Sequence, residues 1–412
     1  MWRKLALTFA VALPAVVLRL AGVHLPPLLA ILIFGAGVVT TAVILSWAAE
    51  AAQVDISSAA AIAILAVVAV LPEYAVDLYF AYTAGSHPEY TQFAAANMTG
   101  SNRLLLGIGW PLVTFVGIWA LRRRRTTLDE TRASAPRPRM IALASNSRVE
   151  LGFLAIASAY AFVIPLTRAI AWYDAVILLV LFGLYLLRVS REQRAEPELL
   201  GIAADLAHLP TRQRRPVVAG MFLAAAAIVV MSAEPFANGL VEGGRQLGID
   251  QFLLVQWLAP LSSEAPEMIV ATLFALRLRA EDGLGILLSA KVNQWTLLVG
   301  SLWIAYTLGG GSGPIVLDDR QTEEFLLTAT QALLGVAVLL DLRLGTREAA
   351  ILFGLFILQF PFPQTEVRIA FSGLYVAIAV VRIATRRAEL GPTFRAVLRR
   401  PSDPATVAAD PA

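Results

Sequence analysis

Apolar runs of about 20 residues recur along this chain, and as a helix each could cross a hydrocarbon core roughly 30 Å thick. The composition agrees, with 58% hydrophobic residues, 15% charged residues and a mean hydropathy of +0.70. The chain has no cysteine, and its three histidines lack zinc-ligand spacing, so neither a disulfide framework nor a zinc site is expected. We therefore predict an all-α, polytopic transmembrane helical bundle without a sizeable soluble domain.

Hydropathy windows predict about twelve spans. The first window resembles a signal peptide, but Arg19 and the absence of a clear cleavage site favour a retained helix. The 347–361 window is short and precedes Pro363, so a hairpin or a tilted half-span stays open there. The windows lie near 5–21, 26–49, 59–84, 91–120, 149–167, 171–188, 216–241, 251–277, 283–308, 325–341, 347–361 and 367–385.

Basic residues collect in alternate connections, as the positive-inside rule requires. The connections 122–148 and 189–215 carry many arginines, whereas the intervening ones are short or acidic, such as that with Asp318 and Asp319. We expect an integral protein of the cell (inner) membrane with both termini cytoplasmic. The net charge of +3 then reflects topology, and we expect membrane lipid and inorganic cations as partners but no nucleic acid.

Two segments share a layout: a helix with Pro-Glu, a short polar turn, and a second helix with asparagine. On the predicted topology the helix at 59–84 runs outward and the helix at 251–277 runs inward, so the two copies are inverted. Inverted repeats with helices broken at proline, here Pro72 and Pro266, place a binding site near the bilayer midplane. The predicted organisation is an N-terminal half (1–190) with a repeat at about 46–110, a linker (191–215), a C-terminal half (216–385) with a repeat at about 234–308, and a cytoplasmic tail (386–412).

This arrangement resembles the paired repeats of the sodium/calcium exchanger superfamily, whose helices carry Thr-Ser-x-Pro-Glu and then Gly-Asn-x-x-Gly-Ser-Asn. The chain looks like a divergent bacterial-type member, with the ten-span core of the family at 26–361. The resemblance implies an antiporter that exchanges calcium or another cation for sodium or protons. By residue, Glu73 and Glu267 match the central ion-binding glutamates, Asn97 and Asn102 match asparagines of the first repeat, and Ser263 matches the threonine of the second.

Four carboxylates fall on the helices with Pro-Glu: Glu73 and Asp77 at i,i+4, and Glu264 and Glu267 at i,i+3. A charge inside a span costs roughly 2.5–3.5 kcal/mol, so such a cluster needs pairing, protonation or ion binding. Carboxylate and amide oxygens bind hard cations, and Asn293 completes the candidate ion-binding set. Ion pairing is the alternative role for the acids, above all for Asp77, which could instead lie near the outer interface.

The sequence departs from the family pattern at several positions, and these differences lead to a second hypothesis. Ala69 and Val70 replace the hydroxyl pair of the first repeat, and basic Lys291 and Arg103 lie at the depth of the acids. With four acids and two bases facing one cavity, the site would carry minus two rather than minus four. Lys291, Arg103 or both would then replace bound cations, reduce the number of ions exchanged and favour proton coupling. The alternative is that each base pairs permanently with one acid, or that Lys291 reaches the cytoplasmic interface.

Two other classes of function compete with antiport. A channel, or a non-transporting protein that keeps the exchanger fold with a blocked ion site, would show the same spans. An enzyme is disfavoured, because the spans hold no His-Glu-x-x-His, no cysteine nucleophile and no serine–histidine pair. We expect no cofactor, only transported cations (Ca²⁺, Na⁺ or H⁺). The transported ion, the driving ion, the stoichiometry and the oligomeric state are left open.

Overall fold

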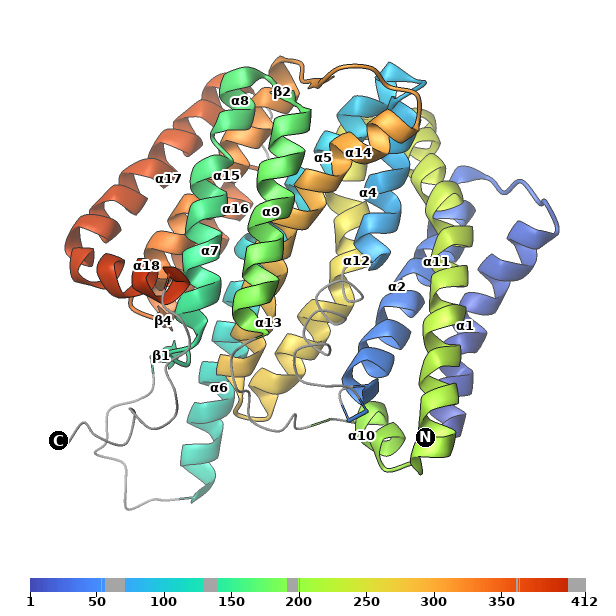
Figure 1. Cartoon of the computed structure of the whole chain (residues 1–412), viewed down its shortest axis with the longest axis horizontal. Coiled ribbons are helices and arrows are strands. Elements are labelled where there is room, and N and C mark those ends of the chain that lie inside the picture. Colours follow the sequence, from blue (N-terminus) through green and yellow to red (C-terminus); the bar gives the residue numbers. More distant parts are fainter. Residues whose placement is uncertain are drawn as a thin grey trace.

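The chain forms a bundle of helices that run roughly along one common direction (Figure 1). The computed structural model describes residues 1–52, 54–55, 71–128, 139–190, 199, 201–360, 362 and 364–398, and the side chains of all of these except 125–128 and 266. The helices are α1 (Trp2–Leu20), α2 (Pro27–Ala52), α4 (Leu71–Ala84), η1 (Pro88–Tyr90), α5 (Thr91–Leu104), η2 (Leu105–Gly109), α6 (Trp110–Leu128), α7 (Ser147–Tyr160), α8 (Val163–Thr167), α9 (Trp172–Val189), α10 (Ile202–Ala207), α11 (Thr211–Leu247), α12 (Gln251–Leu276), α13 (Ala280–Asn293), η3 (Gln294–Leu298), α14 (Val299–Leu308), α15 (Asp319–Leu339), α16 (Thr346–Leu358), α17 (Thr365–Thr385), η4 (Arg387–Glu389) and α18 (Leu390–Leu398).

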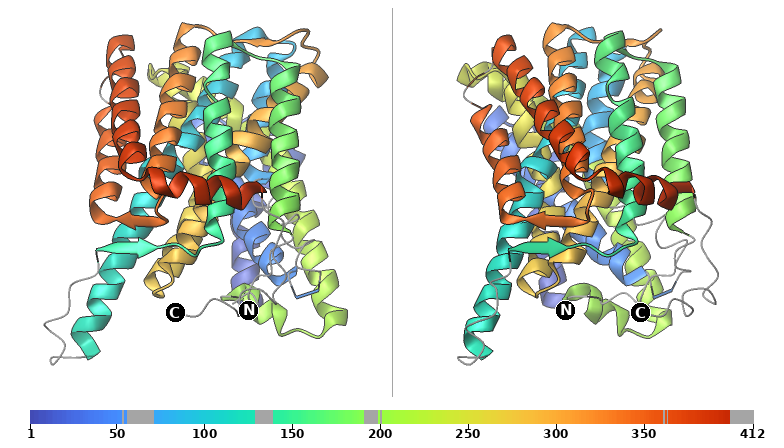
Figure 2. Two further views of the ribbon diagram at one scale, coloured as in Figure 1. Left: turned by 60° about the vertical axis from the view of Figure 1, so that its left-hand side comes forward. Right: turned by 90° about the vertical axis from the view of Figure 1, so that its left-hand side faces the viewer.

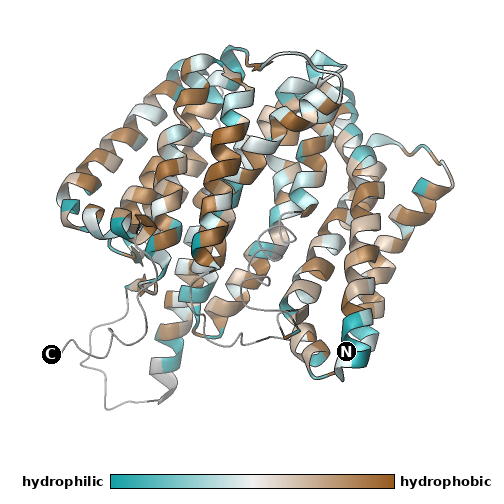
Figure 3. Cartoon of the chain, in the orientation of Figure 1, coloured by the Kyte–Doolittle hydropathy of each residue, from teal (hydrophilic) through white to brown (hydrophobic). Residues whose placement is uncertain are grey.

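The outer surface of the bundle is apolar along its middle (Figure 3). Helix α9 shows the pattern: Val176, Val180, Leu184 and Leu187 are all more than half exposed. Such a stripe is unfavourable in water and suits lipid. Seven helical segments among the described residues are long and apolar enough to cross a membrane: Pro27–Ala52, Pro88–Arg124, Ser147–Thr167, Trp172–Val189, Thr211–Leu247, Asp319–Leu339 and Thr365–Thr385.

The predicted spans coincide with helices or with consecutive helices, and the 59–84 window is described from Leu71 onward. The all-α membrane bundle is therefore confirmed, while the count of about twelve crossings stays a prediction. Helix α16 has 13 residues. At 1.5 Å per residue it spans about 20 Å, less than a full hydrocarbon core. This length agrees with a half-span in the 347–361 window.

The two repeats are inverted and have the same local architecture. The turn from α4 to α5 and the turn from α12 to α13 lie at opposite ends of the bundle (Figure 1). Helices α5 and α13 both have 14 residues, and each continues into a five-residue π-helical turn, η2 or η3. A π-helical turn inserts extra backbone into a helix and is frequent at functional sites. Its presence in both copies supports a common origin.

One expectation about the repeats is wrong. Helix α12 is continuous from Gln251 to Leu276, so the predicted break at Pro266 is absent. A proline removes one backbone hydrogen bond, but neighbouring helices can support the remaining turns. Helix α4 begins at Leu71, directly before Pro72. The residues that would precede a break at Pro72, together with Ala69 and Val70, lie outside the described residues.

The two repeats cross where glycine allows close approach. Gly100 of α5 faces the backbone of α12, and a Cβ atom there would lie 1.8 Å from the carbonyl oxygen of Gln256. Only a residue without a side chain permits this distance between the two helix backbones. The crossing brings the polar face of α5 against the polar part of α12.

Short antiparallel strand pairs join the two halves at both ends of the bundle (Figure 1). Strand β1 (Met140–Ala142) pairs with β4 (Arg343–Gly345) at one end, and β2 (Ala169–Ile170) pairs with β3 (Ile315–Val316) at the other. Helix α18 lies across the bundle and packs on α7 (Figure 2). These contacts link the segment 140–170 to the segment 315–398, outside the two repeats.

Candidate functional site

Carboxylates from both repeats meet in the buried interior. Gln294, the first residue of η3, donates its Nε2 to Glu264 Oε1 at 2.6 Å and to Glu73 Oε1 at 3.3 Å. Glu73 is 4% exposed and Glu264 is 2% exposed. The structure therefore places an acid of α4 and an acid of α12 on either side of one amide. Two acids this close attract a cation or a proton, because two ionised carboxylates repel each other.

The other two acids extend this cluster. Asp77, one turn beyond Glu73, is fully buried and lies close to Glu73 and Asn97. Asp77 is therefore enclosed by protein, while its depth in the membrane stays a prediction. Glu267 is partly buried and lies close enough to Glu73 for the two carboxylates to interact electrostatically. Within the described part of the chain, the carboxylate of Asp77 faces the side-chain amide of Asn97, but neither group makes a hydrogen bond of ordinary geometry. Unpaired buried oxygens are costly and make good cation ligands.

Lys291 joins the same interior from α13. Its Nζ donates to the backbone carbonyl of Asn102 and, at 2.9 Å, to the side-chain Oδ1 of Asn102. Lys291 is 1% exposed, so the alternative in which it reaches the cytoplasmic interface is wrong. The ammonium group therefore donates hydrogen bonds to one backbone oxygen and one side-chain amide oxygen of the first repeat. These are the kinds of oxygen that coordinate metal cations.

Arg103 does not belong to this cluster. Its guanidinium donates to Glu324 of α15 and lies over the ring of Trp257, 4.9 Å from the ring centroid. Neighbouring residues on a helix point about 100° apart, so Asn102 faces Lys291 while Arg103 faces α15. Four carboxylates and one ammonium remain, so the formal charge of the cluster is minus three rather than the expected minus two.

The two remaining residues of the predicted set contribute less directly. The hydroxyl of Ser263 donates to the backbone carbonyls of Ala259 and Pro260 within its own helix, at 3.3 Å each. Asn293 is buried at the C-terminal end of α13. Among the described residues, no three acidic or histidine side chains converge in a way that could hold a metal ion. A cation here would need amide or backbone oxygens beside the carboxylates.

The sequence prediction missed the role of Gln294, which bridges the two repeats. The available signal was a polar amide inside an apolar span directly beyond Lys291 and Asn293. It also missed Glu324, the fully buried partner of Arg103. Nothing in the sequence links these two residues, because their contact joins helices that are 221 positions apart.

These features define a polytopic helical membrane protein with inverted repeats and a buried acidic cluster at their junction. The model of the family described as "Sodium/calcium exchanger protein" matches residues 26–191 and 217–362. A search of the curated proteins gave no significant match.

Solved structures share the architecture. The structure titled "Crystal Structure of H+/Ca2+ Exchanger CAX" is 42% identical, has a TM-score of 0.89, and the match covers 96% of this chain and 97% of that one. Native YfkE is 18% identical with a TM-score of 0.59, covering 89% and 98%. The sodium-calcium exchanger NCX_Mj is 18% identical with a TM-score of 0.51, covering 81% and 99%. The latter two show a common fold. The chain belongs to the sodium/calcium exchanger family.

Proposed function

We propose that the protein is a secondary active antiporter that exchanges calcium for protons by alternating access. The observation that carries this proposal is the pair Glu73 and Glu264, contributed by oppositely inserted repeats and bridged by Gln294 in the buried interior. Carboxyl groups bind either a hard cation or a proton, so the same side chains can serve both ions in alternation. The structure that is 42% identical is titled as an exchanger of these two ions.

In this proposal the transported ion contacts carboxylates of both repeats. Glu73, Glu264 and Glu267 supply charge, and Asp77 with Asn97 supplies further oxygens that make no hydrogen bond of ordinary geometry among the described residues. Rocking of one repeat against the other would expose this cluster to either side of the membrane in turn. We further propose a location in the cell membrane with both termini cytoplasmic, in line with the distribution of basic residues.

The ammonium of Lys291 supports a limited ion stoichiometry. It donates hydrogen bonds to two oxygens of Asn102 that could otherwise coordinate a second bound cation. We propose that Lys291 replaces one exchanged cation. The same observation favours an alternative function, that of a non-transporting protein whose ion site is blocked by Lys291. A flux measurement distinguishes this alternative from an antiporter.

The experiment is calcium uptake into proteoliposomes under imposed ion gradients. An outward proton gradient should drive uptake, whereas a sodium or potassium gradient of equal size should not. Glu73→Gln should reduce uptake to the level of empty liposomes, and Glu89→Gln, which changes an exposed acid of η1, should leave it unchanged. Uptake that follows voltage alone would indicate a channel, and no uptake under any gradient would indicate a blocked site. Calcium uptake driven by a sodium gradient would show that the driving ion is sodium rather than the proton.

A further inference from the structure

A second buried charge cluster lies outside the acidic site, between α5, α15 and α17. Glu324 of α15 accepts a hydrogen bond from Arg103 of α5 and forms an ion pair with Arg368 of α17, whose Nη1 lies 2.5 Å from Glu324 Oε1. The side chains of Arg103, Arg368 and Glu324 are 3%, 8% and 0% exposed. Two guanidinium groups therefore share one carboxylate, which leaves a formal excess of one positive charge.

Arg103 is the more enclosed of the two arginines. Arg368 also lines a wider, open pocket of about 400 Å³ together with Glu323, whereas Arg103 does not reach that pocket. Trp257 stacks on the guanidinium of Arg103, but an aromatic ring attracts a cation without neutralising its charge. The Nε atom of Arg103 is buried and has no hydrogen-bond partner among the described residues. An uncompensated charge in a membrane interior is expensive, so a counter-ion is expected.

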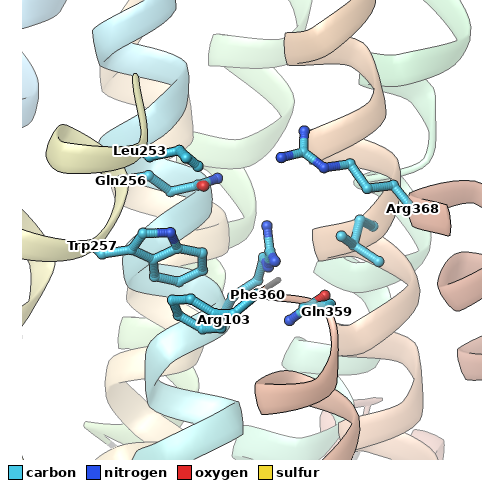
Figure 4. Close-up of a pocket in the computed structure, with 8 residues that line it drawn as sticks. Arg103, Leu253, Gln256, Trp257, Gln359, Phe360 and Arg368 are labelled. Carbon is cyan, nitrogen blue, oxygen red and sulfur yellow. The ribbon is translucent and has the colours of Figure 1, made fainter. Parts of the chain in front are cut away.

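A small cavity lies at this position, with polar groups directed into it (Figure 4). Its volume is about 20 Å³, enough for one species the size of a water molecule or a halide ion. Arg103 and Arg368 approach from two sides, and Gln359 and Gln256 approach from the others (Figure 4). Gln359 is 5% exposed, and in the described part of the chain neither atom of its amide group has a hydrogen-bond partner.

The chemistry of this lining selects an anion. The two guanidinium groups have only donors, and the side-chain amide of Gln359 adds an N–H donor that can be turned toward the cavity. Gln256 donates its Nε2 to Thr99 and contributes one acceptor, its Oε1, so donors outnumber acceptors in the lining. Trp257 and Phe360, whose ring centroids are 4.4 Å apart, form an apolar wall on one side. Charged donors and an apolar wall suit a small, weakly hydrated anion better than a metal cation, which needs oxygen ligands.

We propose that this cavity is a binding site for a small monovalent inorganic anion of halide size, with chloride as the cellular occupant. The anion neutralises the excess charge of the triad of Arg103, Arg368 and Glu324 and joins α5 to α17 and to the C-terminal end of α16. Because Asn102 precedes Arg103 on α5, the occupied site also holds the helix that contributes to the acidic cluster. The proposal is independent of cation exchange, and no transport of the anion is implied.

The test measures thermal unfolding of the purified full-length protein in detergent. Sodium chloride and sodium bromide are titrated against sodium gluconate at constant ionic strength. The wild type should show a saturable rise of the unfolding midpoint with chloride and with bromide. Gln359→Leu, which removes one donor and leaves the ion triad intact, should raise the half-saturating concentration about tenfold. Gln246→Leu, at an exposed position of α11, should leave it unchanged.

Two results would overturn the proposal. Equal midpoints in chloride and gluconate for the wild type would show that no anion binds, and an identical rise in the Gln359→Leu and Gln246→Leu variants would show a general salt effect. If Gln359→Leu does not fold, crystals of the wild type grown in bromide decide the question. A bromide anomalous peak beside Arg103 supports the site, and density for water alone contradicts it.

Discussion

The two repeats share a backbone and differ in their chemistry. Helices α5 and α13 have the same length and the same π-helical continuation, so Asn102 and Lys291 occupy equivalent positions, each two residues before the end of its helix. These two equivalent residues contact each other, because Lys291 Nζ donates to Asn102 Oδ1 at 2.9 Å. An amide in the first repeat thus corresponds to an ammonium group in the second.

This difference teaches that the backbone of the repeat has been retained while its ligands have diverged. The first repeat supplies Asp77 and Asn97, whose polar side-chain atoms make no hydrogen bond of ordinary geometry among the described residues. The second supplies Gln294 as a bridge and Lys291 as an internal cation. An asymmetric site of this kind is expected to bind fewer ions than two identical halves would.

The largest effect is expected from removing a carboxylate in either repeat. Glu73→Gln and Glu267→Gln should each lower calcium exchange by about a hundredfold or more, since the loss of a buried charged contact costs about 3 kcal/mol or more and 1.4 kcal/mol is tenfold. The rates are measured by calcium uptake into proteoliposomes. Glu242→Gln, at a partly exposed position near the end of α11, serves as the control. If only one of the two central variants loses exchange, the two repeats do not share one site.

The next effect concerns the helix crossing. Gly100→Ala places a Cβ atom 1.8 Å from the carbonyl oxygen of Gln256, so α5 and α12 must separate. Overpacking of this kind costs typically 1–3 kcal/mol, and about 3 kcal/mol is expected here. In the second repeat Gly285 has no neighbour within 4 Å of an added Cβ, so Gly285→Ala should be neutral or stabilise by roughly 0.5–1 kcal/mol. Thermal unfolding of the two variants measures the contrast, and equal losses would contradict the crossing.

A smaller effect is expected at Lys291. If its ammonium stands in for a bound cation, Lys291→Ala should let one more monovalent cation enter and change the charge moved per calcium ion. The apparent affinity for the driving ion should shift by about tenfold, roughly 1.4 kcal/mol. Calcium flux at several imposed membrane potentials measures the coupling ratio, with Lys291→Arg as the control that keeps the charge. An unchanged ratio and affinity would assign Lys291 to folding alone.

The smallest effect concerns the end of α2. Arg214 donates to Asp55 through Nε at 2.6 Å and through Nη2 at 2.8 Å, and the guanidinium holds the pKa of Asp55 below its usual value. A lowered pKa in the folded state means that this pair stabilises the fold at neutral pH. The contribution is lost as the pH falls through the folded-state pKa.

Asp55→Asn should therefore lower the free energy of unfolding by about 1 kcal/mol at neutral pH, allowing for partial exposure of the pair. Unfolding midpoints of the wild type and the variant are compared from neutral pH to about pH 3, below the usual Asp pKa of about 3.9. Their difference should shrink as the pH falls. A difference that stays constant with pH would show that Asp55 acts through packing rather than charge.

Much of the fold could be predicted from the sequence, because hydropathy and the distribution of arginine are local signals. The helices fall where the apolar windows lie, and the inverted arrangement of the Pro-Glu segments is observed. The meeting of Glu73 with the acids of α12 followed from this inversion. The continuous course of α12 could not be predicted, since neighbouring helices decide whether a proline breaks a helix.

The direction of each side chain could not be predicted to the same extent. Arg103 and Asn102 are adjacent in sequence, yet one pairs with Glu324 and the other with Lys291. Depth in the membrane follows from position along a span, but the face of the helix depends on packing and on the π-helical turn that follows. The ion triad with Arg368 joins three separate helices, and no local pattern indicates such a contact.

The most direct measurement is equilibrium binding of radioactive calcium to the purified protein and to its single variants Glu73→Gln and Glu267→Gln. Because both repeats supply ligands to one ion, each variant alone should lose nearly all saturable calcium binding. A variant that retains half of the bound calcium with unchanged affinity would show two independent sites and would contradict a shared site between the repeats.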